Sequence, residues 1–505
     1  MLYESTRGNA GQVSSQEAIL RGLAPDGGLY VPSGRAGLAP GNIAGRSYKE
    51  VAMQVLGGWL DDWPREELGA SVREAYSTLA FDTPEIAPLH HLDARTSVLE
   101  LWHGPTCAFK DLALQILPRL VARARRAEGR EGDLVVLVAT SGDTGSAALA
   151  GFRDVPGTRV VVFYPEDGVS EVQRLQMTTM EGANVHAVGV RGGDFDAAQA
   201  GVKAIFGDKA FCAALAAAGL ELSSANSINW GRLVPQIAYW FWAWARLFAE
   251  GRVRKDERVT VVVPTGNFGN ILSAWYARAM GLPLGRLVCA SNANDVLTRF
   301  LAGGEYDRRR ALVKTMSPSM DIIVSSNLER LLFELGGRDP GQVRSWMESL
   351  AGEGHYAVPS GLFESVRDIF WGASTTEEET LASIRRTWRD SRYLADTHTA
   401  VALDALRKYR EAVGDASPTI VASTASPFKF NAAVAAALFG EAAVKEAGGD
   451  EFRLVDLVSR ECGLDVPRGL VGLRERPIRH AGRCETTGMK EALTGILGLA
   501  RGGKR

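Results

Sequence analysis

One lysine stands where its amine could act as a nucleophile. Lys110 follows a Gly-Pro turn and the dipeptide Ala108-Phe109, and it precedes an apolar stretch that is typical of a buried helix. A lysine side chain is usually exposed to solvent and charged. Burial beside an aromatic ring would lower the pKa of the Lys110 amine and favour its neutral form. A neutral lysine can form a Schiff base with a carbonyl compound, and this is the first chemistry that the sequence suggests.

Two glycine-containing loops could bind an anion such as phosphate. They are residues 141–145 (SGDTG) and residues 266–270 (GNFGN), and each follows a valine-rich run and precedes a helical pattern. Free backbone N–H groups and a helix dipole would then face a ligand. The alternative is that the glycines only permit tight turns between strand and helix. Neither loop matches the dinucleotide fingerprint or the nucleotide-binding P-loop.

Alternating strand-like and helix-like patterns must position these residues. Short apolar runs predict strands buried on both faces, at 134–139, 159–164, 184–190, 259–263, 287–290 and 419–423. Helical patterns lie between most of them, which predicts an α/β fold with parallel sheets. Ligands of such sheets bind beyond the carboxyl ends of the strands, where both glycine loops fall. A reactive lysine, a phosphate-binding loop and an α/β sheet together meet the requirements of a pyridoxal-phosphate site.

Composition excludes several other classes. The chain has 57 Lys and Arg against 59 Asp and Glu, a balance that argues against nucleic acid or a membrane surface as the partner. Five scattered cysteines without C-x-x-C spacing predict no disulfide framework and a reducing cytosol. No metal site is expected, since the histidines lack ligand spacing. The apolar run at 233–249 is interrupted by Pro235, Gln236 and Arg246, which predicts a buried aromatic-rich helix rather than a membrane span.

The chemistry-bearing segments resemble those of the threonine synthase family, which consists of fold-type II pyridoxal-phosphate enzymes. The motifs follow the family's order through nearly the whole chain, which is far more specific than any one motif. They are residues 5–8 (STRG), 24–32 (APDGGLYVP), 104–111 (GPTCAFKD), 140–145 (TSGDTG), 224–230 (SANSINW), 264–270 (PTGNFGN), 315–321 (TMSPSMD) and 423–427 (STASP). Three residues depart from the family's pattern, namely Cys107, Ser426 and Phe428.

The resemblance implies an α/β fold of the fold-type II class, similar to the β subunit of tryptophan synthase. Two open α/β domains would hold the cofactor in the cleft between them. Residues 1–92 would form an N-terminal domain of mixed helices and turns. Residues 93–225 would form the smaller α/β domain, with the Schiff-base lysine and the SGDTG loop. Residues 226–505 would form the larger α/β domain, with the GNFGN loop and a helical insertion near 300–415.

The resemblance also implies which residues hold the cofactor, pyridoxal 5'-phosphate. Lys110 would form the Schiff base and act as the catalytic base, and Thr424 would hydrogen-bond the pyridine nitrogen. A threonine hydroxyl cannot stabilise a pyridinium as a carboxylate would, so the ring nitrogen would stay largely neutral. The cofactor phosphate would be bound by Gly266, Asn267, Phe268, Gly269 and Asn270.

Substrate contacts are implied at two places. Ser141, Gly142 and Thr144 would bind the amino-acid carboxylate through hydroxyls and backbone N–H groups. Arg7, Asn229 and Lys429 are candidates for the substrate phosphate, because a dianion requires charge-assisted donors. For Arg7 and Asn229 an ordinary surface or structural role is an equal alternative. The role of Asp143 stays open, and His398, which follows Asp396, is either a site residue or a structural histidine.

The family's reaction converts O-phospho-L-homoserine and water to L-threonine and inorganic phosphate, by γ-elimination and β-addition. An alternative on the same scaffold is a phospholyase that releases phosphate and ammonia from O-phosphohomoserine or phosphoserine and leaves a 2-keto acid. A third hypothesis is a non-catalytic binding protein that has kept the fold. The expected partner is a small-molecule substrate rather than nucleic acid or membrane, for a cytoplasmic monomer or homodimer.

Overall fold

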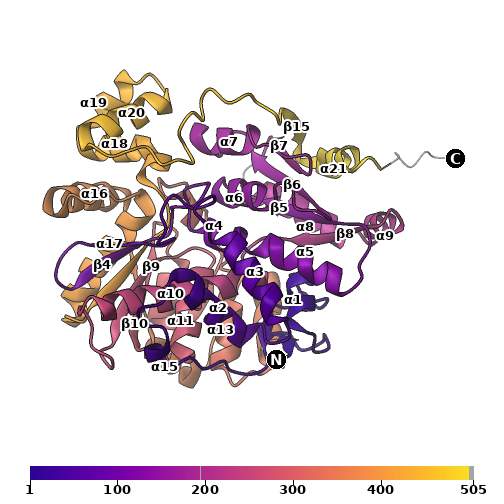
Figure 1. Ribbon diagram of the computed structural model, residues 1–505, viewed down its shortest axis with the longest axis horizontal. Helices are drawn as coiled ribbons and strands as arrows, with labels where there is room; N and C mark the ends of the chain where they lie inside the picture. The colour runs from indigo at the N-terminus through magenta and orange to yellow at the C-terminus, as the bar shows by residue number, and fades with distance from the viewer. Residues whose placement is uncertain (194, 500–505) are drawn as a thin grey trace.

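Two β-sheets organise the chain, as Figure 1 shows for the computed structural model, which describes residues 1–193 and 195–499. One is a five-stranded sheet in the order β15-β7-β6-β5-β8, and the other is a six-stranded sheet in the order β13-β10-β9-β14-β4-β3. All strand pairs in them are parallel except β3 with β4. The prediction of an α/β fold with parallel sheets is therefore confirmed.

The strands of the five-stranded sheet are β5 (Asp133–Ala139), β6 (Thr158–Pro165), β7 (Val185–Arg191), β8 (Leu220–Ser224) and β15 (Gly482–Glu485). Those of the six-stranded sheet are β3 (Leu89–His91), β4 (Thr96–Glu100), β9 (Val259–Pro264), β10 (Leu284–Ser291), β13 (Phe370–Ser374) and β14 (Thr419–Ser423). The valine-rich runs of the sequence form the central strands because such a strand buries side chains on both faces.

Alternate residues of each strand enter different hydrophobic clusters. In β5, Val136 and Val138 pack with α6 (Asp143–Phe152), whereas Val135 and Leu137 pack with α8 (Phe195–Gly207) and α21 (Met489–Leu497). In the six-stranded sheet, Val261 and Val263 face α10 (Trp230–Ala249) and α11 (Gly269–Ala279), while Val262 faces α17 (Thr397–Val413). Each sheet therefore has helices on both faces, and the strand ends are left for ligands.

The strand pairing crosses the domain limits predicted from the sequence at three places. β3 falls within 1–92, but it pairs with β4 in the six-stranded sheet. β4 falls within 93–225, but it pairs with β14 in the six-stranded sheet. β15 falls within 226–505, but it extends the five-stranded sheet beside β7. Sequence position alone did not indicate these exchanges, because strand pairing depends on which edges meet in space.

Shorter elements complete the chain. The N-terminal segment contains β1 (Tyr3–Ser5), α1 (Ser15–Arg21), β2 (Tyr30–Pro32), α2 (Tyr48–Trp59) and α3 (Arg65–Ala75). The helices α4 (Lys110–Leu114), α5 (Leu117–Ala127), α7 (Glu171–Thr178) and α9 (Lys209–Ala217) accompany the five-stranded sheet. Residues 296–391 form α12 (Val296–Gly303), β11 (Glu305–Asp307), α13 (Leu328–Leu335), α14 (Pro340–Gly352), β12 (His355–Ala357), α15 (Ser360–Arg367) and α16 (Glu377–Ser391). A C-terminal group of α18 (Asn431–Phe439), α19 (Glu441–Glu446) and α20 (Glu451–Cys462) lies beside α16 and α7 in Figure 1.

The aromatic-rich helix predicted at 233–249 is the central helix α10. The Asn229 side chain caps its first turn by accepting a hydrogen bond from the Gly231 N–H. Its Trp230 ring meets the rings of Tyr3 and Tyr276 at centroid distances of 5.5 and 5.3 Å. None of the helices in the described part of the chain is long and apolar enough to cross a membrane.

His103 fastens the loop that leads from β4 toward Lys110. Its two ring nitrogens lie 2.7 Å from an Asp82 carboxylate oxygen and 2.8 Å from a Glu100 carboxylate oxygen. Burial alone would lower the pKa of His103, but the hydrogen bonds and charges of the two carboxylates raise it to about 9. The raised pKa means that the folded chain binds this proton more tightly than the unfolded chain does.

Replacing this imidazolium should destabilise the fold in a pH-dependent way. The contribution of His103 is complete below its unfolded pKa of about 6.5 and is lost as the pH rises through about 9. We expect His103→Gln to lower the free energy of unfolding by about 1–3 kcal/mol at pH 6, and by much less at pH 10. Urea unfolding at both pH values measures this. The exposed His90, changed to Gln, is the control; an equal loss at both pH values for His103→Gln would contradict the assignment.

Candidate active site

Lys110 lies beside the carboxyl end of β14 in the six-stranded sheet. It begins α4, and the backbone just before it is bound to residues that follow β14. The Phe109 N–H donates to the Thr424 carbonyl at 2.8 Å, and the Ser426 N–H donates to the Cys107 carbonyl at 3.1 Å. Because β4 and β14 are parallel neighbours, both segments leave the sheet at its carboxyl edge. The fold therefore places Lys110 beside Thr424.

The Lys110 side chain is buried, as its surroundings in the sequence predicted. Only 9% of the residue is exposed. Its Nζ atom lies 3.1 Å from Asp143 Oδ2 and 3.1 Å from Ser319 Oγ. Burial lowers the pKa of the Lys110 amine, and the Asp143 carboxylate acts in the opposite direction. The amine is thus closer to its nucleophilic, neutral form than a surface lysine would be.

Asp143 links two buried lysines. While Oδ2 faces Lys110, Oδ1 lies 2.7 Å from Lys429 Nζ and accepts a hydrogen bond from Gln173 Nε2 at 2.9 Å. Burial alone would raise the pKa of Asp143, but Lys110 and Lys429 together hold it well below its usual value. Asp143 therefore remains a carboxylate, and its role, which the sequence left open, is that of a shared counter-ion.

Ser319 and Gln173 are contacts of this cluster that the sequence reasoning did not single out. Ser319 belongs to the motif at 315–321, which gave a resemblance but no role, and it lies in a short 3-10 turn (Pro318–Met320). Gln173 lies in α7, and it reaches Asp143 past Gly142, where a Cβ atom would come within 2.5 Å of the Gln173 side chain. The signal for Gln173 was its place in the capping sequence of α7, which indicates helix formation and not a site.

The GNFGN loop has the geometry of an anion-binding site. Phe268 adopts the left-handed conformation, with φ of 64°, and α11 begins immediately after it without a side-chain cap. The first N–H groups of the helix are therefore free to bind a ligand. Asn270 Oδ1 accepts a hydrogen bond from the Tyr239 hydroxyl at 2.7 Å. The buried Nδ2 atom of Asn270 has no hydrogen-bond partner among the described residues.

This combination fits the phosphate of pyridoxal phosphate. Buried polar groups are nearly always hydrogen-bonded, so the lone Asn270 Nδ2 donor indicates a missing acceptor. Gly266 borders the turn of Ser319, because a Cβ atom at Gly266 would lie 2.8 Å from the Ser319 carbonyl oxygen. The phosphate loop and the amine-binding turn are thus in direct contact.

Cys107, which departs from the family's pattern, is buried. Burial raises the pKa of its thiol to about 12, which suits a packing role.

The SGDTG loop lies between β5 and α6. The Thr140 hydroxyl accepts hydrogen bonds from the N–H groups of Gly142 and Gly145, each at 2.9 Å. Gly142 has a φ of 126°, which favours glycine. Ser141 lines a cavity of about 700 Å³, together with Gln173, Lys429 and residues of the loop at 312–321. This cavity therefore reaches the cluster of Lys110 and Asp143 from the outside.

All three candidate phosphate ligands have protein partners, and those of Lys429 are Asp143 and the Thr106 carbonyl. Arg7 donates from Nε and Nη2 to the two carboxylate oxygens of Glu329, at 3.0 and 2.9 Å. Asn229 donates from Nδ2 to the carbonyls of Ile19 and Ser224 and caps α10 with Oδ1. These contacts support the alternative of a structural role for both residues, and the assignment of Arg7 and Asn229 to the substrate phosphate stays a prediction. Of these three candidates, Lys429 is the one that lines the 700 Å³ cavity.

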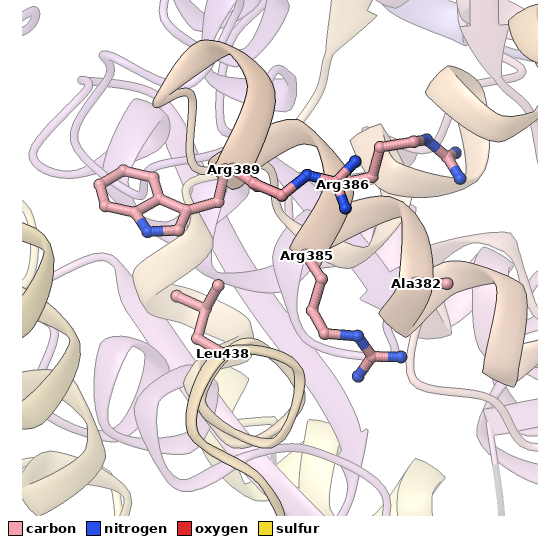
Figure 2. A pocket seen from close by; sticks show the side chains of 6 residues that line it. Ala382, Arg385, Arg386, Arg389 and Leu438 are labelled. Atoms are coloured by element: carbon pink, nitrogen blue, oxygen red, sulfur yellow. The ribbon is translucent and has the colours of Figure 1, made fainter.

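A second cavity, of about 530 Å³, lies at the surface between α16 and α18. Figure 2 shows its lining, with Arg385, Arg386 and Arg389 on α16 and Leu438 on α18. No residue predicted to bind cofactor or substrate lines it. Within the described residues, no group of three or more His, Cys, Asp or Glu side chains is arranged to hold a metal ion.

Three family models match the chain, and together they cover most of residues 2–479. Residues 82–424 match the model of pyridoxal-phosphate dependent enzymes. Residues 2–76 match the model of the threonine synthase N terminus, and residues 399–479 match the model of the threonine synthase C-terminal region.

Relatives of known sequence and structure agree with these matches. Threonine synthase of Pseudomonas aeruginosa is 40% identical over 468 residues, which cover 91% of this chain and 94% of that protein. Threonine synthase-like 1 of Homo sapiens is 42% identical, over 84% of this chain but only 58% of the human protein. A crystal structure of pyridoxal-phosphate-bound threonine synthase from Brucella melitensis superposes with a TM-score of 0.86 at 37% identity, covering 99% of this chain and all of that one.

The matches reach from the N-terminal segment through the lysine, both glycine loops and the end of β14. The chain belongs to the threonine synthase family of pyridoxal-phosphate-dependent enzymes.

Proposed function

We propose that the chain is a threonine synthase, which converts O-phospho-L-homoserine and water to L-threonine and inorganic phosphate. The observation that carries the proposal is the buried Lys110 amine, which contacts Asp143 and Ser319 next to an open phosphate loop. A lysine in such a setting is suited to Schiff-base formation and to general-base catalysis on a small amino acid.

Residues that follow three strands of the six-stranded sheet would hold the cofactor. Lys110 would bind it covalently, and the loop from Gly266 to Asn270 would hold its phosphate through backbone N–H groups and the free Asn270 Nδ2. Thr424 would hydrogen-bond its ring nitrogen. When bound, pyridoxal phosphate supplies an electron sink for the substrate carbons from which protons are removed.

The chain's own residues would then control protons and charge. Lys110 Nζ would accept the proton that leaves Cα and return it to the cofactor-bound substrate. The neutral amine would then accept the proton that leaves Cβ, before phosphate departs from Cγ and water adds at Cβ. Burial favours the neutral amine needed for the first of these transfers. The N–H groups and hydroxyls of Ser141 and Thr144, at the start of α6, would bind the substrate carboxylate. Gly142, whose N–H donates to the Thr140 hydroxyl, would shape the turn between them.

Lys429 is the residue we assign to the substrate phosphate. Its ammonium has three N–H donors, of which one faces Asp143 Oδ1 and one donates to the Thr106 carbonyl at 2.8 Å. The Lys429 side chain is fully buried, but the residue borders the 700 Å³ cavity, and we assign its third donor to a ligand that enters there. A charge-assisted hydrogen bond to a phosphate oxygen is among the stronger polar contacts in a protein.

We further propose a cytoplasmic enzyme that acts as a monomer or homodimer, with partners other than nucleic acid or membrane. The five cysteines are all free, which suits a reducing compartment. Size-exclusion chromatography with light scattering would distinguish the two assembly states.

Loss of Lys110 should abolish the reaction. We expect Lys110→Ala to reduce kcat by at least about a thousandfold, because both the Schiff base and the catalytic base are removed. Borohydride treatment of the wild-type holoenzyme should attach the reduced cofactor to the Lys110 peptide, as peptide mass spectrometry would show. Lys255→Ala, at an exposed lysine of the turn before β9, is the matched control. Undiminished turnover in Lys110→Ala would disprove the mechanism.

The product distinguishes the proposed synthase from a phospholyase. With O-phospho-L-homoserine we expect L-threonine and phosphate in equal amounts, measured by chiral amino-acid analysis and a phosphate assay. If 2-ketobutyrate and ammonia were the main products, the chain would be a phospholyase instead. Absence of any turnover by the cofactor-loaded chain would favour the non-catalytic binding protein.

Lys429 and Asn229 should give opposite results on substitution. We expect Lys429→Met to raise KM for O-phospho-L-homoserine by about tenfold or more, the effect of losing one charged hydrogen bond. Asn229→Ala should leave KM within about twofold and lower the free energy of unfolding by about 0.5–2 kcal/mol, through loss of the helix cap. Steady-state kinetics and urea unfolding measure both. A large rise in KM for Asn229→Ala would restore it as a phosphate ligand.

A further inference from the structure

Ser319 is oriented toward the Lys110 amine by Asp143. Its hydroxyl donates to Asp143 Oδ2 at 3.0 Å, so the oxygen is left as an acceptor for Lys110 Nζ at 3.1 Å. A lysine ammonium has three N–H donors. Asp143 and Ser319 accept two of them, and the third is directed elsewhere. The pair thus fixes the direction in which Lys110 can exchange a proton.

The backbone of Ser319 is held by a buried histidine. The Ser319 N–H donates to His398 Nε2 at 3.2 Å, so Nε2 acts as an acceptor and carries no proton. The ring proton of a neutral His398 is then on Nδ1, which lies 2.9 Å from Asp396 Oδ1. His398 is 2% exposed and Asp396 is fully buried. The carboxylate therefore sets the histidine tautomer that can bind Ser319.

Asp396 is itself fixed by the first turn of α17. It caps this helix by accepting hydrogen bonds from the N–H groups of His398, at 2.8 Å, and Thr399, at 3.3 Å. On its other side the turn of Ser319 abuts the phosphate loop at Gly266. A continuous chain of contacts thus joins the N-terminus of α17 to the reactive amine.

We propose that Ser319 is a catalytic residue that holds the Lys110 amine in its reactive orientation, and that His398 and Asp396 are positioning residues that hold Ser319. The identity of the reaction rests on the proposed function, whereas the contact itself does not. When the protonated Lys110 amine returns a proton to the substrate, its third N–H bond breaks and a C–H bond to a substrate carbon forms. Only this proton moves, and Ser319 and Asp143 keep their protonation states.

The pKa of Lys110 tests the contact without any turnover. In the full chain freed of cofactor, competitive acetylation at a series of pH values, followed by peptide mass spectrometry, gives this pKa. We expect Ser319→Ala to lower it by about one unit, because the charged form loses a hydrogen bond. Ser319→Thr should restore it, and Ser365→Ala, at an exposed serine of α15, should match the wild type. An unchanged Lys110 pKa in Ser319→Ala would overturn the proposal.

Kinetics of the holoenzyme test the orientation. Ser319→Ala should lower kcat by about tenfold or more, with KM within about twofold of the wild type, because the lost contact is to the base and not to the substrate. The pH at which kcat rises as the Lys110 base loses its proton should fall by the same one unit. Equal losses through KM would contradict a role for Ser319 in orienting the amine.

Two variants at one position separate positioning from folding. His398→Gln retains an acceptor for the Ser319 N–H, whereas His398→Leu does not. We expect His398→Leu to reproduce the Lys110 pKa shift of Ser319→Ala and His398→Gln to retain most of the wild-type value. A folded His398→Leu variant with the wild-type Lys110 pKa and kcat would refute the positioning role. If His398→Leu does not fold, a His398→Gln variant that shows the full shift in the Lys110 pKa would refute it instead. A wild-type chain that makes no threonine but shows the pKa shift would refute the proposed function and not this inference.

Discussion

The site depends on one carboxylate that pairs with two buried lysines. Removing a lysine ammonium from water costs several kcal/mol unless a counter-ion compensates it, and Asp143 faces both Lys110 and Lys429. The three side chains come from segments that follow strands of two different sheets. Asp143 begins a helix of the five-stranded sheet, while the two lysines follow strands β4 and β14 of the six-stranded sheet. The ion cluster therefore also joins the two halves of the fold.

This arrangement explains why glycine is needed near the cluster. At Gly142 a side chain would collide with Gln173, which donates to the same Asp143 carboxylate. At Gly266 it would collide with the backbone of Ser319, which carries the hydroxyl bound to Lys110. Both glycines stand in loops that follow parallel strands, and both permit close packing. The loop of Gly266 also leaves the first turn of α11 without a side-chain cap, so its N–H groups can bind an anion.

The lysine segment and the end of β14 are connected through a backbone hydrogen bond. The Phe109 N–H and the Thr424 carbonyl join the lysine segment to the end of β14, across more than three hundred residues of sequence. This contact follows from the parallel pairing of β4 with β14, which brings both carboxyl ends to one edge. A rigid sheet edge is a suitable support for a reactive group, because its positions are fixed by the ladder of hydrogen bonds.

Much of this protein was determined by the sequence itself. The valine-rich runs at 134–139 and 259–263 predicted buried parallel strands, because no other element buries apolar residues on both faces over so short a length. The apolar surroundings of Lys110 predicted its burial, and the loop at 266–270 predicted a free helix N-terminus. These are local properties of a strand, a turn and a helix start.

Only the tertiary structure decided which side chains meet. Arg7 is paired with Glu329, and the Asn229 amide caps α10 and donates to two carbonyls, although the types of both residues suit a phosphate. Asp143 became the partner of Lys110 and Lys429, and Ser319 came into contact with the amine, through elements far apart in the chain. Composition and spacing specify which element a residue belongs to. The pairing of sheets and the packing of loops at their edges specify its neighbours, and the neighbours determine its charge, orientation and chemistry.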